Sequence, residues 1–341
     1  MPAFYNKHLG IKYGEGYYFD PAYCAQIERC EELFLYEVFG KYGFGSADPV
    51  PSGNFIIQPV DIIMGTQDAQ WRFPDDGTVE SWGTPWKGLS IADISAIDPR
   101  EAAYHPVIDR MLAQYTELCE FVGEKADLFW SKTGLMNVHT PYTTAHQLCG
   151  EDLFVTMLTE PESALVIFWK IWDIYKAIFA RVTEVTGSSL TRVQLGDCSA
   201  AMLSEQVYRN VVLPVNKQIC AKFNSAGYHS CGPSTHLLTA FADLHGVDAI
   251  ELGPGTDIRS AHHLMPHRHL KPLIDPVAMK DMNPDGVSSM VENIIRDAEG
   301  SPSTTLCTWA LDRETPLENV EALLQQVYDI NKSVYLELVE G

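Results

Sequence analysis

From about residue 127 onward, the hydrophobic and polar positions alternate between two kinds of spacing along the chain. Short apolar runs of strand length alternate with longer segments whose apolar residues recur at helical spacing. This alternation favours a parallel sheet covered by helices, because each parallel strand needs a crossover before the next one. We expect strands at 127–134, 191–197, 227–232, 248–253, 269–275 and 303–308, with helices between them.

The longest apolar stretch, ALVIFWKIWDIYKAIFA at 164–180, predicts a buried amphipathic helix. Lys170, Asp173 and Lys176 interrupt it at intervals of three, which places them on one helical face. These charges argue against a membrane span, which needs about 20 consecutive, predominantly apolar residues.

Four residues mark where helices should begin. Thr159 in TEPE and Thr315 in TPLE each stand three positions before a glutamate, which is the pattern of a capping box. Ser204 and Asn283 precede helical segments, and their side-chain oxygens can accept hydrogen bonds from the N–H groups of a first turn. We therefore expect N-caps at all four positions.

Residues 1–126 do not show this alternation of strand-length runs and helical spacing clearly. Within them, PDDGT at 74–78 predicts a hairpin turn between two aromatic strands. We interpret this part as an irregular N-terminal cap or insertion that contains an early barrel strand. Together with the βα units of 127–341, it predicts a single α/β domain over 1–341. The expected fold is a (β/α)8 TIM barrel with its site at the C-terminal ends of the strands.

Charge and composition narrow the range of functions. The 341 residues include 24 Lys and Arg against 45 Asp and Glu, a formal net charge of -21. Such a chain repels nucleic acid and anionic membrane surfaces, so we expect neither as a partner. The N-terminus MPAFYNKHLGIKYGEG lacks the features of a secretion signal, which indicates a cytoplasmic location. In that reducing compartment the eight cysteines should be thiols or metal ligands.

Three residues at predicted strand ends have the chemistry to bind a metal. His229 and Cys231 lie two positions apart, so they point to the same side of a strand, and Cys307 lies at the end of the last strand. One imidazole and two thiolates make a three-ligand zinc site with an open fourth position, as catalytic zinc requires. The alternative is a hydrogen-bonded core histidine with two buried thiols, and these residues alone leave both interpretations open.

Two further residues, His139 and Tyr142 in NVHTPYT, are candidates for the pocket wall, although packing within a loop is favoured for both. The glycine patterns KYGEG, KYGFGS and LGPGTD lack the full phosphate-binding or dinucleotide-binding fingerprints. We interpret them as loops.

Five segments of the chain resemble the uroporphyrinogen decarboxylase superfamily. Within it they are most similar to the zinc-dependent, corrinoid-linked methyltransferases, which include the methylcobamide:coenzyme M methyltransferases. The segments are NVHTPYTTAHQLCGEDLFVTMLTEPE (137–162), LGDCSAAMLSEQVYRNVVLPVNKQI (195–219), YHSCGPSTHLL (228–238), LIDPVAM (273–279) and TPLENV (315–320). They stand in the family's order.

The resemblance implies a TIM barrel with zinc ligands at His229, Cys231 and Cys307. It makes Glu251 in DAIEL a candidate fourth ligand in the resting site. It also places Asp197 of LGDC at the barrel mouth, where it would orient the substrate, with a strand-end turn or cap as the alternative. One departure is that Cys307 precedes TPLE by more residues than is usual in the family.

The implied function is transfer of a methyl group between a corrinoid, such as methylcobalamin or a methyl-corrinoid protein, and a zinc-activated thiol. The chain has no D-x-H-x-x-G corrinoid-anchoring motif, so the expected partner is a separate small corrinoid protein. The first alternative is demethylation of an ether or amine onto a corrinoid protein. The second is porphyrinogen decarboxylation, against which the N-terminal region shows no RQAGR-like segment. A non-catalytic binding protein on the same barrel is the third.

Overall fold

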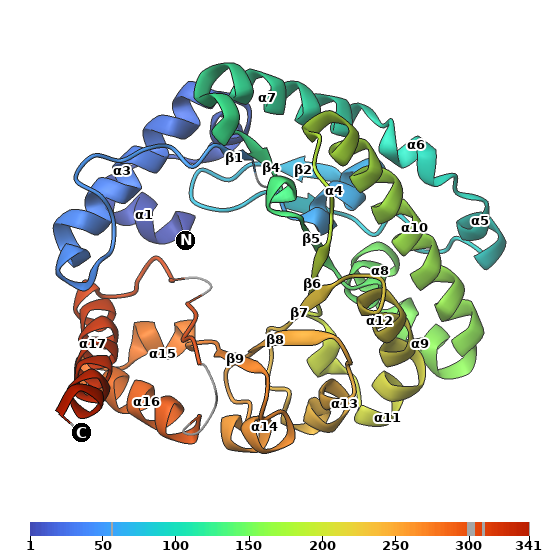
Figure 1. The fold of residues 1–341 in the computed structure, drawn as a ribbon. Helices are drawn as coiled ribbons and strands as arrows, with labels where there is room; N and C mark the ends of the chain where they lie inside the picture. Colours follow the sequence, from blue (N-terminus) through green and yellow to red (C-terminus); the bar gives the residue numbers. More distant parts are fainter. Residues whose placement is uncertain (56, 299–303, 309–310, 341) are drawn as a thin grey trace.

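The computed structural model describes residues 1–55, 57–298, 304–308 and 311–340. Its central feature is a parallel sheet in the order β5-β6-β7-β8-β9 (Figure 1). β1 pairs in parallel with β4, and parallel bridges join Thr304 and Cys307 to the chain at and just after β9. This parallel arrangement confirms the predicted TIM barrel. The strands are β1 (Asn54–Phe55), β2 (Gln70–Arg72), β3 (Glu80–Trp82), β4 (Asp127–Leu128), β5 (Leu135–His139), β6 (Arg192–Gly196), β7 (Ser225–Ser230), β8 (Val247–Leu252) and β9 (His269–Pro272).

Helices form a ring around these strands, and the N-terminal helices (blue) lie beside the C-terminal helix α17 (red) in Figure 1. Lys41 Nζ lies 2.5 Å from Glu321, and the Tyr42 hydroxyl donates to Gln325 at 2.8 Å, which joins the two ends of the chain. The helices are α1 (Pro2–Leu9), α2 (Gly14–Phe19), α3 (Pro21–Phe39), α4 (Pro59–Thr66), α5 (Ile91–Ala96), α6 (Pro99–Ala103), α7 (Pro106–Val122), α8 (Pro141–Cys149), α9 (Asp152–Thr159), α10 (Pro161–Thr186), α11 (Glu205–Val207), α12 (Leu213–Cys220), α13 (Leu238–Ala242), α14 (Ile258–Leu264), α15 (Pro276–Asp281), α16 (Pro284–Asp297) and α17 (Leu317–Glu340).

The strands of the main sheet present two different faces. Val138, Leu195 and Ile250 point outward and are buried in the main hydrophobic cluster, in which residues of α8, α10 and α12 also take part. Their neighbours on the inward face, such as Asn137 and Gln194, are polar and only partly buried. Alternation with period two therefore separates an apolar layer beneath the helices from a polar barrel interior.

The predicted strands at 191–197, 227–232, 248–253 and 269–275 correspond to β6–β9. Residues 304–308 of the last predicted strand follow β9 as expected, while residue 303 lies outside the described residues. The prediction for 127–134 is confirmed only at its start, because β4 ends at Leu128 and a 3-10 turn follows. The separate strand β5 covers residues that the sequence pattern assigned to a loop.

The amphipathic helix is confirmed as part of α10, where Lys176 pairs with Asp173 at 2.8 Å. Ser204 and Asn283 cap helices as predicted, by accepting the backbone N–H groups of Val207 and Gly286.

The other two cap predictions were wrong. Thr159 is the last residue of α9, and α10 begins only at Pro161. Thr315 lies two residues before α17, and its buried hydroxyl has no hydrogen-bond partner among the described residues. At Thr159, α9 packs directly against α10, and this tertiary constraint overrides the local capping pattern.

The hairpin in the N-terminal part is confirmed by the antiparallel pairing of β2 with β3, joined by a turn at Asp75–Asp76. None of the helices in the described residues is long and apolar enough to cross a bilayer.

Candidate functional site

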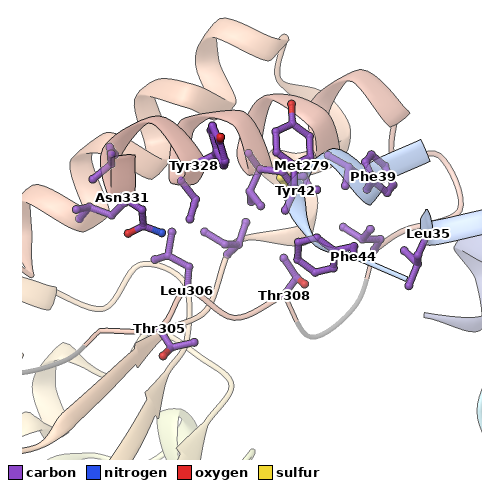
Figure 2. A pocket seen from close by; sticks show the side chains of 18 of the residues that line it. Leu35, Phe39, Tyr42, Phe44, Met279, Thr305, Leu306, Thr308, Tyr328 and Asn331 are labelled. Carbon is purple, nitrogen blue, oxygen red and sulfur yellow. The ribbon is translucent and has the colours of Figure 1, made fainter. Parts of the chain in front are cut away.

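Two of the cavities in the described part of the chain differ strongly in chemistry. The larger, about 640 Å³, lies between α1, α3, α17 and residues 304–308, and Figure 2 shows its apolar walls. Its described lining residues include no His, Cys, Asp, Glu, Lys or Arg side chain. The smaller, about 280 Å³, lies inside the barrel and contains two histidines and a glutamate. Of these two cavities, the smaller therefore offers the imidazole and carboxylate groups that catalysis needs.

The barrel cavity is lined by residues at or near the C-terminal ends of successive strands. This is the end at which TIM barrels carry their active sites. The lining residues are Gln58, Pro59, Trp130, Asn137, Val138, His139, Gln194, Gly196, His229 and Glu251.

Strand register explains why these side chains meet. His139 pairs with Gly196, Gly196 with His229, His229 with Glu251, and Glu251 with Lys271, so one inward layer crosses five strands. In the layer below, a Cβ at Gly227 would lie 1.8 Å from the carboxamide oxygen of Gln194. Glycine at 227 therefore leaves the space that the Gln194 side chain occupies.

A short chain of polar contacts runs along the top of this layer. The Nδ1 atom of His229 lies 2.9 Å from Oε2 of Glu251, and its Nε2 atom lies 2.8 Å from Sγ of Cys231. Cys231 Sγ lies 2.9 Å from Cys198 Sγ. Glu251 also pairs with Lys271, at 3.4 Å. Within the described residues, one group of His, Cys, Asp and Glu atoms lies within 4.8 Å of one another: Cys198, His229 and Cys231.

Close backbone packing fixes the position of Cys231. A Cβ on Gly253, just after β8, would lie 2.1 Å from the carbonyl oxygen of Cys231. Only glycine allows the two loops to approach so closely. The loops after β7 and β8 are thus packed against each other at the backbone of Cys231.

The contacts in the cluster shift the pKa values of its members. Burial opposes a charged imidazole, yet the hydrogen bonds to Cys231 and Glu251 raise the pKa of His229 to about 9. The hydrogen bonds with Cys198 and His229 lower the pKa of Cys231 to about 5 in spite of its burial. In the metal-free protein the two groups therefore form an imidazolium–thiolate pair at neutral pH.

Asp197 lies beneath the cluster and is fully buried. Its Oδ1 accepts hydrogen bonds from Thr140 and Thr143, at 2.8 and 2.9 Å, and its Oδ2 accepts from Tyr228 and Asn216. Burial raises the pKa of this carboxyl group, while these donors oppose the rise. Asp197 thus joins β6, β7 and two helices directly below the thiols.

Residues 93–330 match the model of the uroporphyrinogen decarboxylase (URO-D) family. The chain belongs to the URO-D family. No curated protein matches this URO-D chain. A methyltransferase from Methanosarcina mazei has a similar structure, with a TM-score of 0.64 and 14% sequence identity, over 96% of this chain and 91% of that chain. At this identity the likeness shows a shared fold.

Within this URO-D barrel, the predicted pair His229 and Cys231 does come together. The third member of the compact group is Cys198, which the sequence interpretation had not selected. Cys307 lies outside that group, and its Sγ contacts the backbone oxygen of Thr305 at 3.7 Å. The role of Cys307 as a zinc ligand, which the resemblance implied, stays a prediction, and Cys198 is an alternative third ligand.

The two predicted carboxylates occupy different positions. Glu251 stands behind the ring of His229 and contacts the nitrogen opposite Cys231, so in this arrangement it orients the imidazole. Asp197 is not among the residues that line the cavity. The structure thus shows contacts through which both residues position others, and their predicted catalytic roles stay predictions.

His139 and Tyr142, the two candidates for the pocket wall, also occupy different positions. His139 belongs to β5 and lines the cavity, and burial together with the charge of His229 lowers its pKa to about 4. Tyr142 is packed in the core, where its hydroxyl donates to the backbone oxygen of Ser199 at 3.2 Å. The expectation of loop packing was therefore wrong for His139.

The signal that could have identified Cys198 is the period of two along β6. Gly196 faces the cavity, Asp197 faces the core, and the next inward position is 198. The sequence interpretation considered only the acidic residue of LGDC and did not apply this alternation to its neighbour.

Proposed function

We propose that this URO-D family member is a zinc-dependent methyltransferase that moves a methyl group between a corrinoid and a thiol. The observation that carries the proposal is the compact group of two thiols and one imidazole at the C-terminal ends of the barrel strands. Family membership and the fold shared with a methyltransferase support the same class of reaction.

The donor set fits zinc. Zinc prefers thiolate sulfur and imidazole nitrogen, and catalytic sites use three protein ligands with a fourth position left open. Cys198, Cys231 and the Nε2 atom of His229 would hold the ion. A zinc ion bound there would lower the pKa of an incoming thiol and so supply a thiolate nucleophile at neutral pH.

The surrounding residues prepare the site in two ways. Glu251, itself held by Lys271, contacts Nδ1 of His229 and so fixes the ring with Nε2 toward the thiols. Asp197 ties the end of β6 to Tyr228 on β7 and thereby holds the loop that carries Cys198. The ligands are thus positioned by contacts among side chains that are largely buried.

In the proposed reaction the methyl group leaves cobalt without its bonding electrons. The thiol sulfur supplies the electron pair of the new C–S bond, and the thiol proton is released. The products are a methyl thioether and cob(I)alamin. The corrinoid would come from a separate small corrinoid protein in the cytoplasm, because the chain has no D-x-H-x-x-G motif of its own.

The alternatives differ in what they require of the site. Porphyrinogen decarboxylation must bind a whole tetrapyrrole inside the barrel, whereas the barrel cavity is about 280 Å³ and pockets for drug-sized ligands are roughly 300–1,000 Å³. In the proposed reaction the corrinoid ring stays on its partner protein and presents only the methyl group to the site. Demethylation of an ether or amine would use the same cluster in the opposite direction. It is therefore distinguished by the assay rather than by the geometry.

The test is an anaerobic assay with zinc-loaded protein, methylcobalamin and a small thiol, followed by the absorbance of the corrinoid. We expect cob(I)alamin and methyl thioether in equal amounts. Cys231→Ser should abolish turnover, while Cys30→Ser, which changes a cysteine of α3, should leave turnover unchanged. If no thiol accepts the methyl group but an ether or amine donates one to cob(I)alamin, the demethylating alternative replaces this proposal.

A further inference from the structure

The barrel cavity is polar, its described lining residues include no Lys or Arg, and the imidazole of His229 is already paired with Cys231 and Glu251. Three of its polar groups are carboxamides, supplied by Gln58, Asn137 and Gln194. The nearest cation in the inward layer, Lys271, is already paired with Glu251. An anionic substrate entering this cavity would therefore lose its hydration without gaining a free positive partner, which is costly in a protein interior.

The cavity also lacks a free negative charge. Glu251 is the one carboxylate among the described lining residues, and it contacts both His229 and Lys271. Two thiolates would offset the double charge of a bound zinc ion, and Glu251 and Lys271 offset each other. A cationic substrate would thus find no unpaired carboxylate to replace its lost hydration.

The hydrogen-bonding groups of the cavity, in contrast, are available. Within the described part of the chain, the side chains of Gln58, Asn137 and Gln194 have no hydrogen-bond partner. The Nδ1 atom of His139 is buried and also has none there. Buried polar atoms are rarely left unpaired, so Nδ1 of His139 is expected to pair with a molecule inside the cavity, and the partly buried carboxamides beside it can bind the same molecule.

The available groups both donate and accept. Each carboxamide offers an oxygen acceptor and an NH2 donor, and a neutral imidazole offers one of each. The indole ring of Trp130 forms part of the wall. Its backbone φ of 59° is in the left-handed region, which bulky residues rarely adopt, so the surrounding structure holds it at this wall against a local strain.

We infer that the small molecule bound in the barrel cavity is uncharged and carries its own hydrogen-bonding group. For the proposed reaction it is a thiol with a hydroxyl or amide rather than one with a sulfonate, carboxylate or ammonium group. This inference rests on the proposed function only for the word thiol, because the charge and hydrogen-bonding requirements come from the cavity walls.

Calorimetric titration of the zinc-loaded protein tests the inference without any methyl transfer. The probes are three two-carbon thiols: 2-mercaptoethanol, 2-mercaptoethanesulfonate and 2-aminoethanethiol. We expect the neutral thiol to bind at least tenfold more tightly than either charged one. Asn137→Leu should weaken binding of the neutral thiol, because it removes one of the free carboxamides.

A charge placed in the cavity should reverse the preference. Asn137→Lys is expected to bind the sulfonate at least tenfold more tightly than the unmodified protein does. The matched control is Asn210→Lys, which adds the same charge at an exposed position that does not line the cavity. Asn210→Lys should keep the preference for the neutral thiol.

The outcomes separate this inference from the proposed reaction. If the neutral thiol binds best but receives no methyl group in the corrinoid assay, the cavity inference holds and the proposed function is wrong. If a charged thiol binds as tightly as the neutral one, or if none of the three binds, the cavity inference is wrong whatever the corrinoid assay shows.

Discussion

The two faces of strands β5–β9 are built for different tasks. On the outward face, Val138, Leu195 and Ile250 are buried against the helices. On the inward face, the layer from His139 to Lys271 consists of titratable side chains except for Gly196. Along each strand, therefore, residues of the hydrophobic core alternate with residues of the candidate site.

This contrast shows where the fold obtains its stability. TIM-barrel interiors are ordinarily packed with bulky branched side chains. Here the upper interior is polar and contains a cavity, so in that part of the barrel apolar burial comes from the outward face and the helices packed on it. We therefore expect outward substitutions to change stability and inward substitutions to change metal binding and turnover.

The largest expected effect is on the inward face. His229→Ala removes the nitrogen at the centre of the cluster, so zinc content should fall strongly. Turnover should fall by more than about a hundredfold, which exceeds the loss typical of residues that only support a metal ligand. Metal analysis and the corrinoid assay measure both. Retention of zinc together with turnover in this variant would break the assignment of the inward face.

An outward substitution on the neighbouring strand should do the opposite. Ile250→Ala creates a cavity at a fully buried position next to Glu251, and it should lower the free energy of unfolding by about 2–5 kcal/mol. Denaturant unfolding measures the loss. Zinc content per folded molecule should stay unchanged, and a marked loss of zinc in the folded fraction would show that the two faces are not separable.

A smaller effect is expected at Glu251, whose carboxylate orients the ring of His229 but does not belong to the group of Cys198, His229 and Cys231. Glu251→Gln keeps the shape but removes the charge that supports His229, so zinc affinity should fall by roughly 10- to 100-fold. Competition with a chelator measures it. Unchanged affinity would show that the carboxylate does not act through His229.

The smallest effect concerns the pH dependence of stability. Burial lowers the pKa of His139 to about 4, below its ordinary value of 6.5, so the unfolded chain binds this proton more readily than the folded chain. The free energy of unfolding therefore falls as the pH drops below the ordinary pKa of 6.5 toward the folded-state pKa of about 4. Between pH 7 and pH 5.5 the loss should be about 1 kcal/mol. His139→Gln should remove that part of the decline. Unfolding of chelator-treated protein at both pH values measures it, and an identical decline in the variant would contradict the account.

The sequence alone was sufficient to predict the elements with clear periodicity and the proximity of the two residues of the H-x-C pair. The strands β6–β9 and helix α10 have clear periodicity, and His229 and Cys231 share one strand, so their proximity follows from local geometry. Strand β5 was missed because its end runs directly into Thr140 and Pro141, which resemble a loop.

The period of two along β6 indicates that Cys198 points inward, but its contact with Cys231 could not be recognised from local pattern alone. Its approach to Cys231 depends on the register between β6 and β7, and on the burial of Asp197 among four side chains from other elements. The clash that a Cβ at Gly253 would make with Cys231 is likewise a contact between loops. These are tertiary facts that no spacing within one segment encodes.

X-ray absorption at the zinc edge tests the central claim most directly, because it counts the sulfur ligands of the ion. The account predicts two sulfurs at about 2.3 Å and at least one nitrogen at about 2.0 Å. Cys198→Ser should reduce the sulfur count to one, and Cys307→Ser should leave it at two. An ion without sulfur ligands, or a sulfur count that falls in Cys307→Ser but not in Cys198→Ser, would contradict the assignment of Cys198, His229 and Cys231 as the metal site.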